Sequence, residues 1–305
     1  MTNSGSVEPT PAAIGRVPAP PFVRLPDPRT LFEARRERLA FLAQTSEIAP
    51  YLRFIAGLAA AQSRIQDGLP VPDLPPSDAL ERAREFGMPP LDRNRIGTDD
   101  VLGETLNRLF EAVTPLAKPA EAQGALEKLK AASPERLGNI MSNVLTDTIP
   151  ADALAEHAYV AAGLQVHFAR LAAKLNADRL VGVGDGACPC CGGPPVSSLV
   201  VGWMGAEGAR YCSCSLCGTL WNVVRVKCVL CSSTRGVGYQ EIEGGPGTVK
   251  AECCDNCRGY VKILYQQKDA ALDPVADDIA SLGLDLLLRE GEYRRGGFNP
   301  FLLGG

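Results

Sequence analysis

Residues 188–218 read CPCCGGPPVSSLVVGWMGAEGARYCSCSLCG, and residues 228–258 read CVLCSSTRGVGYQEIEGGPGTVKAECCDNCR. These two stretches decide the fold, because each holds two Cys-x-x-Cys pairs. The pairs are Cys188/Cys191, Cys214/Cys217, Cys228/Cys231 and Cys254/Cys257. Adding 40 to every position in the first two pairs gives the positions of the last two. This shared period indicates an internal duplication of one unit of about 40 residues.

Each Cys-x-x-Cys pair forms a tight turn that aims two sulfurs at one ion. Two such turns facing each other give a tetrahedral site of four sulfurs, which selects zinc or iron. A duplicated unit that closes its own site favours sequential pairing, with one site per unit. An interleaved arrangement, first pair with third and second with fourth, is the alternative. The expected metal ligands are Cys188, Cys191, Cys214 and Cys217 for the first site and Cys228, Cys231, Cys254 and Cys257 for the second.

The residue after each pair sets the backbone freedom of the turn. Gly192 and Gly218 follow the pairs of the first unit, and glycine adopts positive φ without a steric penalty. Ser232 and Arg258 occupy these places in the second unit. We therefore expect the turns of the second unit to be more strained.

Buried thiols and redox-active dithiols are the competing interpretations of a Cys-x-x-Cys pair. Either explains a single pair, whereas four pairs with a repeated spacing favour metal binding.

Cys190, Cys212 and Cys253 lie inside or beside the turns, and we interpret them as small residues next to a site. Cys190 gives its turn a third sulfur, which makes ligand exchange or a redox role conceivable there. His157 and His167 lack the spacing of a ligand pair, so we expect them to be packing residues.

All eleven cysteines fall within residues 188–257, and this segregation divides the chain. We expect an α+β protein, in which an all-helical N-terminal domain precedes two tandem four-cysteine modules and a C-terminal helix from Asp273 to about Glu290. The helical domain is long enough, at about 145 residues, to fold without metal. The expected boundaries are a disordered Pro-rich tail at 1–29, the helical domain at 30–176, a linker at 177–187, the first module at 188–227, the second module at 228–268, and the C-terminal helix and tail at 269–305.

Capping and proline signals predict the helices of the N-terminal domain. Thr30 and Glu33 have the spacing of a capping box. Residues 151–175 carry an apolar stripe, which predicts a helix that packs against its neighbours on one face. Alternation in the cysteine region, as in residues 220–226, predicts short strands. The other expected helix starts are Pro50, Ser77, Thr98, Pro119, Pro134 and Ala151.

Composition and charge limit the class of protein. The chain has 305 residues, of which 46% are apolar, and a formal net charge of −4. This charge argues against a general nucleic-acid binder, which carries an excess of basic residues. No apolar stretch approaches the ~20 residues needed to cross a bilayer. The Pro-rich N-terminus lacks the apolar core of a secretory signal, and no apolar segment follows Arg35-Arg36. We therefore expect a cytoplasmic protein without a membrane span.

Several longer segments of the sequence indicate a protein family more specifically than the cysteine spacing does. They are Cys188-Pro189-x-Cys191-Gly192-x-x-Pro195-Val196-Ser197-Ser198, Val224-Arg225-Val226-Lys227-Cys228, Lys250-Ala251-Glu252-x-Cys254-Asp255-x-Cys257, Leu264-Tyr265-Gln266-x-Lys268-Asp269, Val275-Ala276-Asp277-Asp278, Asn299-Pro300-Phe301-Leu302, Tyr51-Leu52-Arg53-Phe54 and Pro89-Pro90-Leu91-Asp92. In these segments the chain resembles the FdhE family of formate dehydrogenase accessory proteins. The resemblance covers nearly the whole chain beyond the N-terminal tail.

This resemblance implies a cytoplasmic factor without enzymatic turnover, needed for active respiratory formate dehydrogenase and acting on its catalytic subunit before export. It also implies rubredoxin-like iron sites, so that the eight paired cysteines would hold two Fe(Cys)₄ centres, with zinc as the substitute metal. No role transfers to Cys190, Cys212 or Cys253, which are outside the family pattern. We expect the surface between the helical and cysteine regions to contact the client, with Arg53 and Asp92 as contributors.

Two other functions compete with this one. The first is a zinc-ribbon protein with structural zinc that binds protein or nucleic acid. Residues 181–268 carry eight Lys/Arg and six Asp/Glu, a formal +2, and two zinc tetrathiolates of about −2 each would leave no cationic surface for phosphates. The second is a thiol–disulfide oxidoreductase, which needs a Cys-x-x-Cys pair at a helix N-terminus in a βαβ setting. The pairs here lie between strand-like segments instead.

Overall fold

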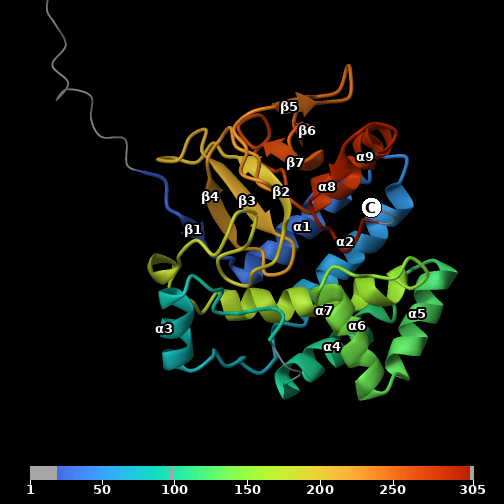
Figure 1. The fold of residues 1–305 in the computed structure, drawn as a ribbon. Helices are drawn as coiled ribbons and strands as arrows, with labels where there is room; N and C mark the ends of the chain where they lie inside the picture. The colour runs from blue at the N-terminus through green and yellow to red at the C-terminus, as the bar shows by residue number, and fades with distance from the viewer. Residues whose placement is uncertain (1–18, 96–98, 303–305) are drawn as a thin grey trace, which may run out of the picture.

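The computed structural model describes residues 19–95 and 99–302 and shows a mixed helix and sheet protein (Figure 1). The helices are α1 (Pro28–Leu42), α2 (Ala49–Arg64), α3 (Ser77–Glu85), α4 (Asp100–Val113), α5 (Ala120–Lys130), α6 (Pro134–Leu145), α7 (Leu154–Ala172), the 3-10 helix η2 (Ala177–Arg179), α8 (Ala276–Ala280) and α9 (Leu282–Arg289). The strands are β1 (Val23–Arg24), β2 (Pro195–Val200), β3 (Arg210–Cys214), β4 (Leu220–Val223), β5 (Val237–Gln240), β6 (Val249–Cys254), β7 (Gly259–Tyr265) and β8 (Arg294–Arg295).

The strands of the cysteine region form one continuous sheet rather than two separate modules. Its order is β1-β4-β3-β2-β7-β6-β5, and β8 pairs with β7. In the first unit β3 is antiparallel to its neighbours β2 and β4, and in the second unit β6 is antiparallel to its neighbours β5 and β7. The two units are joined by β2 and β7, which run parallel. The second unit therefore repeats the first beside it, within the same sheet.

The strand register preserves the 40-residue period of the sequence. In the first unit Ser213 pairs with Leu220, and in the second Cys253 pairs with Tyr260. Both members of the second pair lie 40 positions after those of the first. The duplication predicted from cysteine spacing is thus also present in the backbone pairing.

The secondary structure near both ends of the chain differs from the sequence-based expectation. Residues 1–18 of the expected tail lie outside the described residues, but residues 19–29 include β1, where Val23 pairs with Trp221 of β4. The single helix expected from Asp273 to Glu290 is two short helices, α8 and α9, which meet at Ser281. The carboxylate of Asp273 accepts the N–H groups at the start of α8, from Val275 at 3.0 Å and Ala276 at 2.7 Å.

The observed helix starts show which capping signals were correct. The expected capping box at Thr30 is wrong, because α1 begins at Pro28 and the side chain of Asp27 accepts the N–H of Arg29. Aspartate is as good an N-cap as threonine, and the following proline suits the first helical position. The start at Thr98 lies outside the described residues; α4 begins at Asp100, capped by Asp99. The starts at Ser77 and Pro134 are confirmed, and the other three are displaced to Ala49, Ala120 and Leu154.

Helix α7 is buried on all sides, rather than along the one stripe expected. Sixteen of its 19 residues are buried, as befits a helix at the centre of a fold. Gly163 permits a close approach of α4, because a Cβ at this position would lie 2.5 Å from Leu106. On another side, the Gln165 amide donates a 2.8 Å hydrogen bond to the carbonyl of Ser215 in the cysteine region. Helix α7 thus contacts both parts of the chain.

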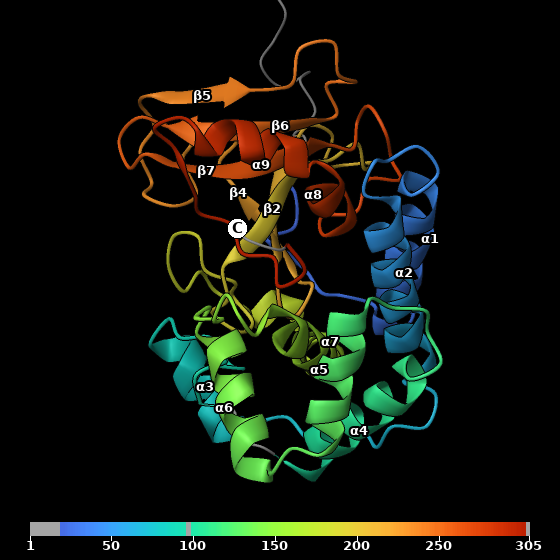
Figure 2. The same ribbon diagram turned by 90° about the vertical axis from the view of Figure 1, so that its right-hand side faces the viewer.

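Buried ion pairs add to this connection between the helices and the C-terminal region. Arg38 of α1 forms a bidentate pair with Asp277 of α8, with distances of 2.7 and 2.9 Å. Arg35 lies 3.4 Å from Asp273. One core cluster runs from the helices through the first cysteine unit to α8. In Figure 2 the helices α4 to α7 lie below the sheet, while α8 and α9 lie beside β6 and β7.

No helix among the residues that the structure describes is long and apolar enough to cross a bilayer.

The sequence predicts a helical domain that folds on its own without metal. The core that this domain shares with the cysteine region leads to the opposite prediction. We expect a fragment of residues 30–176 to melt without a cooperative transition, because Arg35 and Arg38 lose their buried carboxylates and α7 loses part of its cover. Removing one partner of a buried ion pair costs about 3–5 kcal/mol. Thermal circular dichroism of the fragment and the full-length protein measures this. A cooperative transition of the fragment in chelator would show that the helices have a complete core of their own.

Candidate metal centres

Four cysteine sulfurs of the first unit converge between the loop before β2 and the turn after β3. The Sγ atoms of Cys188, Cys191, Cys214 and Cys217 all lie within 4.8 Å of one another. The sulfurs are 3.4 Å apart for Cys191–Cys214 and 3.6 Å apart for Cys188–Cys217. All four side chains are buried. We call this group the first centre.

The second unit forms an equivalent group from Cys228, Cys231, Cys254 and Cys257, which we call the second centre. Here the Sγ separations are 3.8 Å for Cys228–Cys257 and 3.7 Å for Cys231–Cys254. Cys228 and Cys254 are buried, Cys231 is partly exposed, and Cys257 is exposed. Each group uses the two pairs of one unit, so the arrangement is sequential and not interleaved.

Both groups have the donor set and spacing of a tetrahedral metal site. A metal–sulfur bond of about 2.3 Å places the sulfurs of a tetrahedral site about 3.8 Å apart. The second centre has this spacing, and the first is tighter by a few tenths of an ångström. Four sulfurs without a nitrogen or oxygen donor fit zinc or iron. The two groups could therefore each hold one such ion.

The turns around the sulfurs have the same hydrogen bonds in both units. The N–H of Gly192 bonds the carbonyl of Cys188, and the N–H of Ser232 bonds the carbonyl of Cys228. These turns require positive φ after the second cysteine. Gly192 and Gly218 adopt φ values of 75° and 72°, while Ser232 and Arg258 adopt 64° and 55°. The strain predicted for the second unit is confirmed, because residues with a Cβ rarely adopt this conformation.

A loop from the helical part closes over the first centre. The N–H of Leu91 donates to the carbonyl of Cys190 at 2.8 Å, and the N–H of Arg93 donates to that of Cys191 at 3.2 Å. A Cβ on Gly192 would lie 3.1 Å from Pro89. The backbone of the Pro89-Pro90-Leu91-Asp92 segment thus covers the turn that holds Cys188 and Cys191.

Arg93 is a functional candidate that the sequence reasoning missed. Its guanidinium forms two bonds with Asp147, of 2.6 and 3.1 Å, and lies beside the first centre. Burial lowers the pKa of Arg93, but Asp147, Cys191 and Cys214 outweigh that effect, so the pKa is raised. The adjoining proline-rich motif was the only signal in the sequence, since a lone arginine has no ligand spacing. Arg93 supplies positive charge next to two sulfurs of a site that would carry net negative charge.

The second centre has a different setting. The Asn256 amide donates to the Cys231 sulfur at 3.5 Å on the exposed side. The Ser233 backbone N–H, followed by the Asn256 amide, lowers the pKa of Cys231 to about 6. Backbone and amide N–H groups stabilise the thiolate form, which is the form that binds metal.

The remaining cysteines and the histidines stay outside the two groups. Burial raises the pKa of Cys212 to about 12 and that of Cys253 to about 11, so both are neutral thiols. Cys190 accepts a 3.3 Å hydrogen bond from Thr219, next to the first centre. His157 bonds Ala153 and Asn143 within the helical part. His167 is buried on α7, with Nε2 3.9 Å from a carboxylate oxygen of Asp99.

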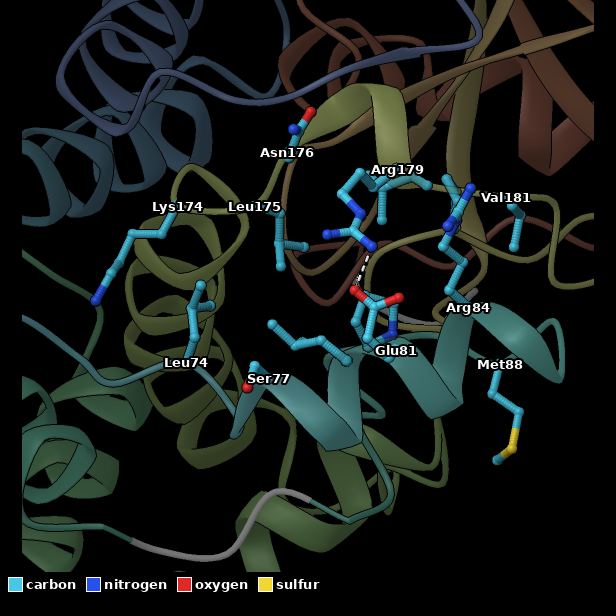
Figure 3. A pocket seen from close by; sticks show the side chains of 14 residues that line it. Leu74, Ser77, Glu81, Arg84, Met88, Lys174, Leu175, Asn176, Arg179 and Val181 are labelled. Atoms are coloured by element: carbon cyan, nitrogen blue, oxygen red, sulfur yellow. Dashed lines mark hydrogen bonds and ion pairs between the residues drawn. The ribbon is translucent and has the colours of Figure 1, made fainter.

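A surface cavity of about 300 Å³ lies beside the first centre, between α3 and the end of α7 (Figure 3). Pro189 of the first turn is one of its lining residues. Figure 3 shows Glu81 and Arg179 facing each other as an ion pair. Lys174 donates to the carbonyl of Pro72. The residues described as lining this cavity include no cysteine or histidine, so the cavity offers no sulfur or imidazole ligand for a metal.

The strained turns can be relieved by substitution. We expect Ser232→Gly and Arg258→Gly each to raise the free energy of unfolding by up to about 1 kcal/mol, because glycine removes the positive-φ penalty. The exposed Arg258–Glu292 ion pair that is lost contributes little. Gly218→Ala is the matched control and should destabilise, since its Cβ would lie 2.7 Å from Leu31. Urea unfolding of the full-length protein measures these changes; destabilisation by both glycine variants would contradict the strain argument.

Charge compensation at the first centre can be tested separately. We expect Arg93→Gln to weaken metal binding at that centre by roughly tenfold, as loss of an outer-sphere partner does. The exposed Arg95 lies in the same loop, and Arg95→Gln should leave the affinity unchanged. Competition between protein and a chelator reports both affinities. Equal affinities for the two variants would show that Arg93 serves only to hold the loop.

The sequence and fold can now be compared with known proteins. FdhE family models match residues 20–185 as the N-terminal domain, 187–225 as the central domain and 226–302 as the C-terminal domain. The FdhE homolog of Rhizobium meliloti is 51% identical over 300 residues, which cover 98% of each chain. That of Cronobacter sakazakii is 35% identical over 290 residues, 94% of this chain and 92% of the relative. The crystal structure of the FdhE protein from Pseudomonas aeruginosa superposes with a TM-score of 0.82 at 33% identity, covering 93% of this chain and 100% of that one. This chain therefore belongs to the FdhE family.

Proposed function

We propose that this protein is a cytoplasmic maturation factor that binds the catalytic subunit of formate dehydrogenase and carries two rubredoxin-like Fe(Cys)₄ centres. It has no catalytic turnover of its own. The observation that carries this proposal is family membership across nearly the whole chain, joined to two four-cysteine groups. The eight paired cysteines are the proposed ligands, and iron or zinc would bind through sulfur alone.

Iron is the proposed metal because of the family resemblance, whereas the geometry fits both metals. A four-thiolate iron centre needs only a partly shielded setting and hydrogen bonds to sulfur to tune its potential. The N–H groups of Leu216 and Cys217, each 3.4 Å from the Cys214 sulfur, supply such bonds. With structural zinc, the same chain would be a zinc-ribbon binding module.

The alternative functions find less support. A thiol–disulfide oxidoreductase needs its cysteine pair at a helix N-terminus, but the pairs lie in turns joined to strands of the sheet. Nucleic-acid binding needs a cationic surface, which the cysteine region lacks once two anionic metal centres are counted.

The client surface is proposed to include the junction of helices and sheet. Arg53 lies exposed on α2 and is available to a partner. Asp92 is less suited, because its carboxylate accepts the N–H of Asn94 at 3.0 Å and so shapes the turn. A factor that must release its client favours a modest, partly polar interface.

The metal content distinguishes iron from zinc. We expect protein purified without air to contain two iron ions per chain and to be red from sulfur-to-iron charge transfer. Elemental analysis and a visible spectrum measure both. Two zinc ions in a colourless protein would favour the zinc-ribbon alternative.

Client binding is tested with the full-length chain. We expect tagged protein to capture the formate dehydrogenase catalytic subunit, and Arg53→Glu to weaken the capture several-fold by reversing an interface charge. Arg64→Glu, on the exposed end of the same helix, is the matched control. Undiminished capture by Arg53→Glu would remove Arg53 from the interface, and absence of capture by the unaltered protein would reject the proposed client.

A further inference from the structure

The duplication allows the two centres to be compared position by position. In the first centre, Cys191 and Cys217 are both 0% exposed. Their equivalents 40 residues later, Cys231 and Cys257, are partly exposed and exposed. The other ligand of each turn is buried in both units. The difference is therefore confined to the second cysteine of each turn.

The helical part accounts for this difference. Gly192, which follows Cys191, faces Pro89 of the covering loop, and Gly218, which follows Cys217, faces Leu31 of α1. Pro89 and Leu31 therefore each lie against the residue that follows one of the two buried cysteines. Cys190 is tied to the loop as well, through the N–H of Leu91.

The second centre has no such cover in the described part of the chain. Ser232 and Arg258, which take the places of the two glycines, are partly exposed and exposed. The Arg258 side chain turns to Glu292 and Asp255 on the surface, at 2.6 and 3.7 Å. Outside the four cysteines of the centre, the exposed Asn256 amide donates to the Cys231 sulfur. Strained turns and open sulfurs occur at the same centre.

We propose that the second centre is the exchangeable one, whose ion passes to a thiolate-bearing acceptor that replaces Cys231 and Cys257, while the first centre is permanent. This rests on the proposed metal binding at both groups. Exposed sulfurs on two different turns would let an acceptor with four thiolates displace Cys231 and Cys257 first, while Cys228 and Cys254 still hold the ion, and then displace these two as well. Each metal–sulfur bond that breaks is replaced by one to the acceptor, and no electron is transferred. Sulfur ligands are the suitable acceptors, because they match the softness of the existing donors.

The test follows metal release from the full-length protein loaded with zinc. Pyridylazoresorcinol, a chromogenic chelator, is added, and release should be biphasic, with one ion leaving at least about tenfold faster than the other. Cys257→Ser should abolish the fast phase and retain the slow one. A synthetic peptide with two Cys-x-x-Cys pairs, which supplies four thiolates, should take one ion per chain, detected by native mass spectrometry.

Matched variants test which centre gives each phase of metal release. Leu31→Ala uncovers Gly218 and should accelerate only the slow phase, whereas Asn256→Ala should accelerate only the fast phase. Alkylation with iodoacetamide, mapped by mass spectrometry, should modify Cys231 and Cys257 before Cys191 and Cys217. This mapping remains informative even if Cys257→Ser does not fold.

Three results would overturn the inference. Two ions per chain that leave in a single phase, or alkylation that reaches both centres equally, would show that the centres are equivalent. Transfer of the first-centre ion to the peptide would reverse the assignment. Loading that yields no bound metal would instead reject the proposed metal binding and, with it, this inference.

Discussion

The parallel pairing of β2 with β7 is the interaction on which the rest of the structure depends. A unit of three short strands and two cysteine turns buries little apolar surface alone, and the pairing turns two such units into one sheet. Arg210 of β3 reinforces it. Its guanidinium is fully buried, lies 2.7 Å from Glu252 of β6, and also bonds Ser198 of β2. A buried charge without its partner is costly, so this pair holds the units in one register.

Placing the units side by side makes them unequal. The cysteine turns of the first unit contact the helical part, at α1, α7 and the loop before α4. The second unit instead receives α8 and α9. Lys262, fully buried on β7, lies 2.5 Å from Asp285 and 3.4 Å from Asp278, which also pair with Arg295. These contacts cover the face of the sheet but leave Cys231 and Cys257 of the second unit at least partly exposed.

This inequality gives a physical reason why an accessory protein would retain two similar centres. A metal site that closes a turn contributes its binding free energy to folding, and at the first centre the covering loop and α7 depend on the same turns. An ion that left this centre would disturb the core shared with the helices. At the second centre Val229, in the turn between Cys228 and Cys231, packs in that core, but none of the four cysteines belongs to it. Loss of an ion there would therefore disturb the core less.

The sequence by itself determined the eight paired cysteines and the duplication, because turn geometry and a period of 40 are local properties of the chain. It favoured their division into two sequential groups, and the tertiary structure decided this against the interleaved alternative. It also indicated the strain at Ser232 and Arg258, since positive φ depends on the residue at one position. It could not determine that β1 joins the sheet, that Asp27 rather than Thr30 caps α1, or that α7 is buried all round. Nor could it reveal Arg93, which reaches the first centre from a loop distant in sequence. Which centre is covered was decided only by the tertiary structure, because cover comes from residues such as Pro89 and Leu31 that the chain brings back from far away.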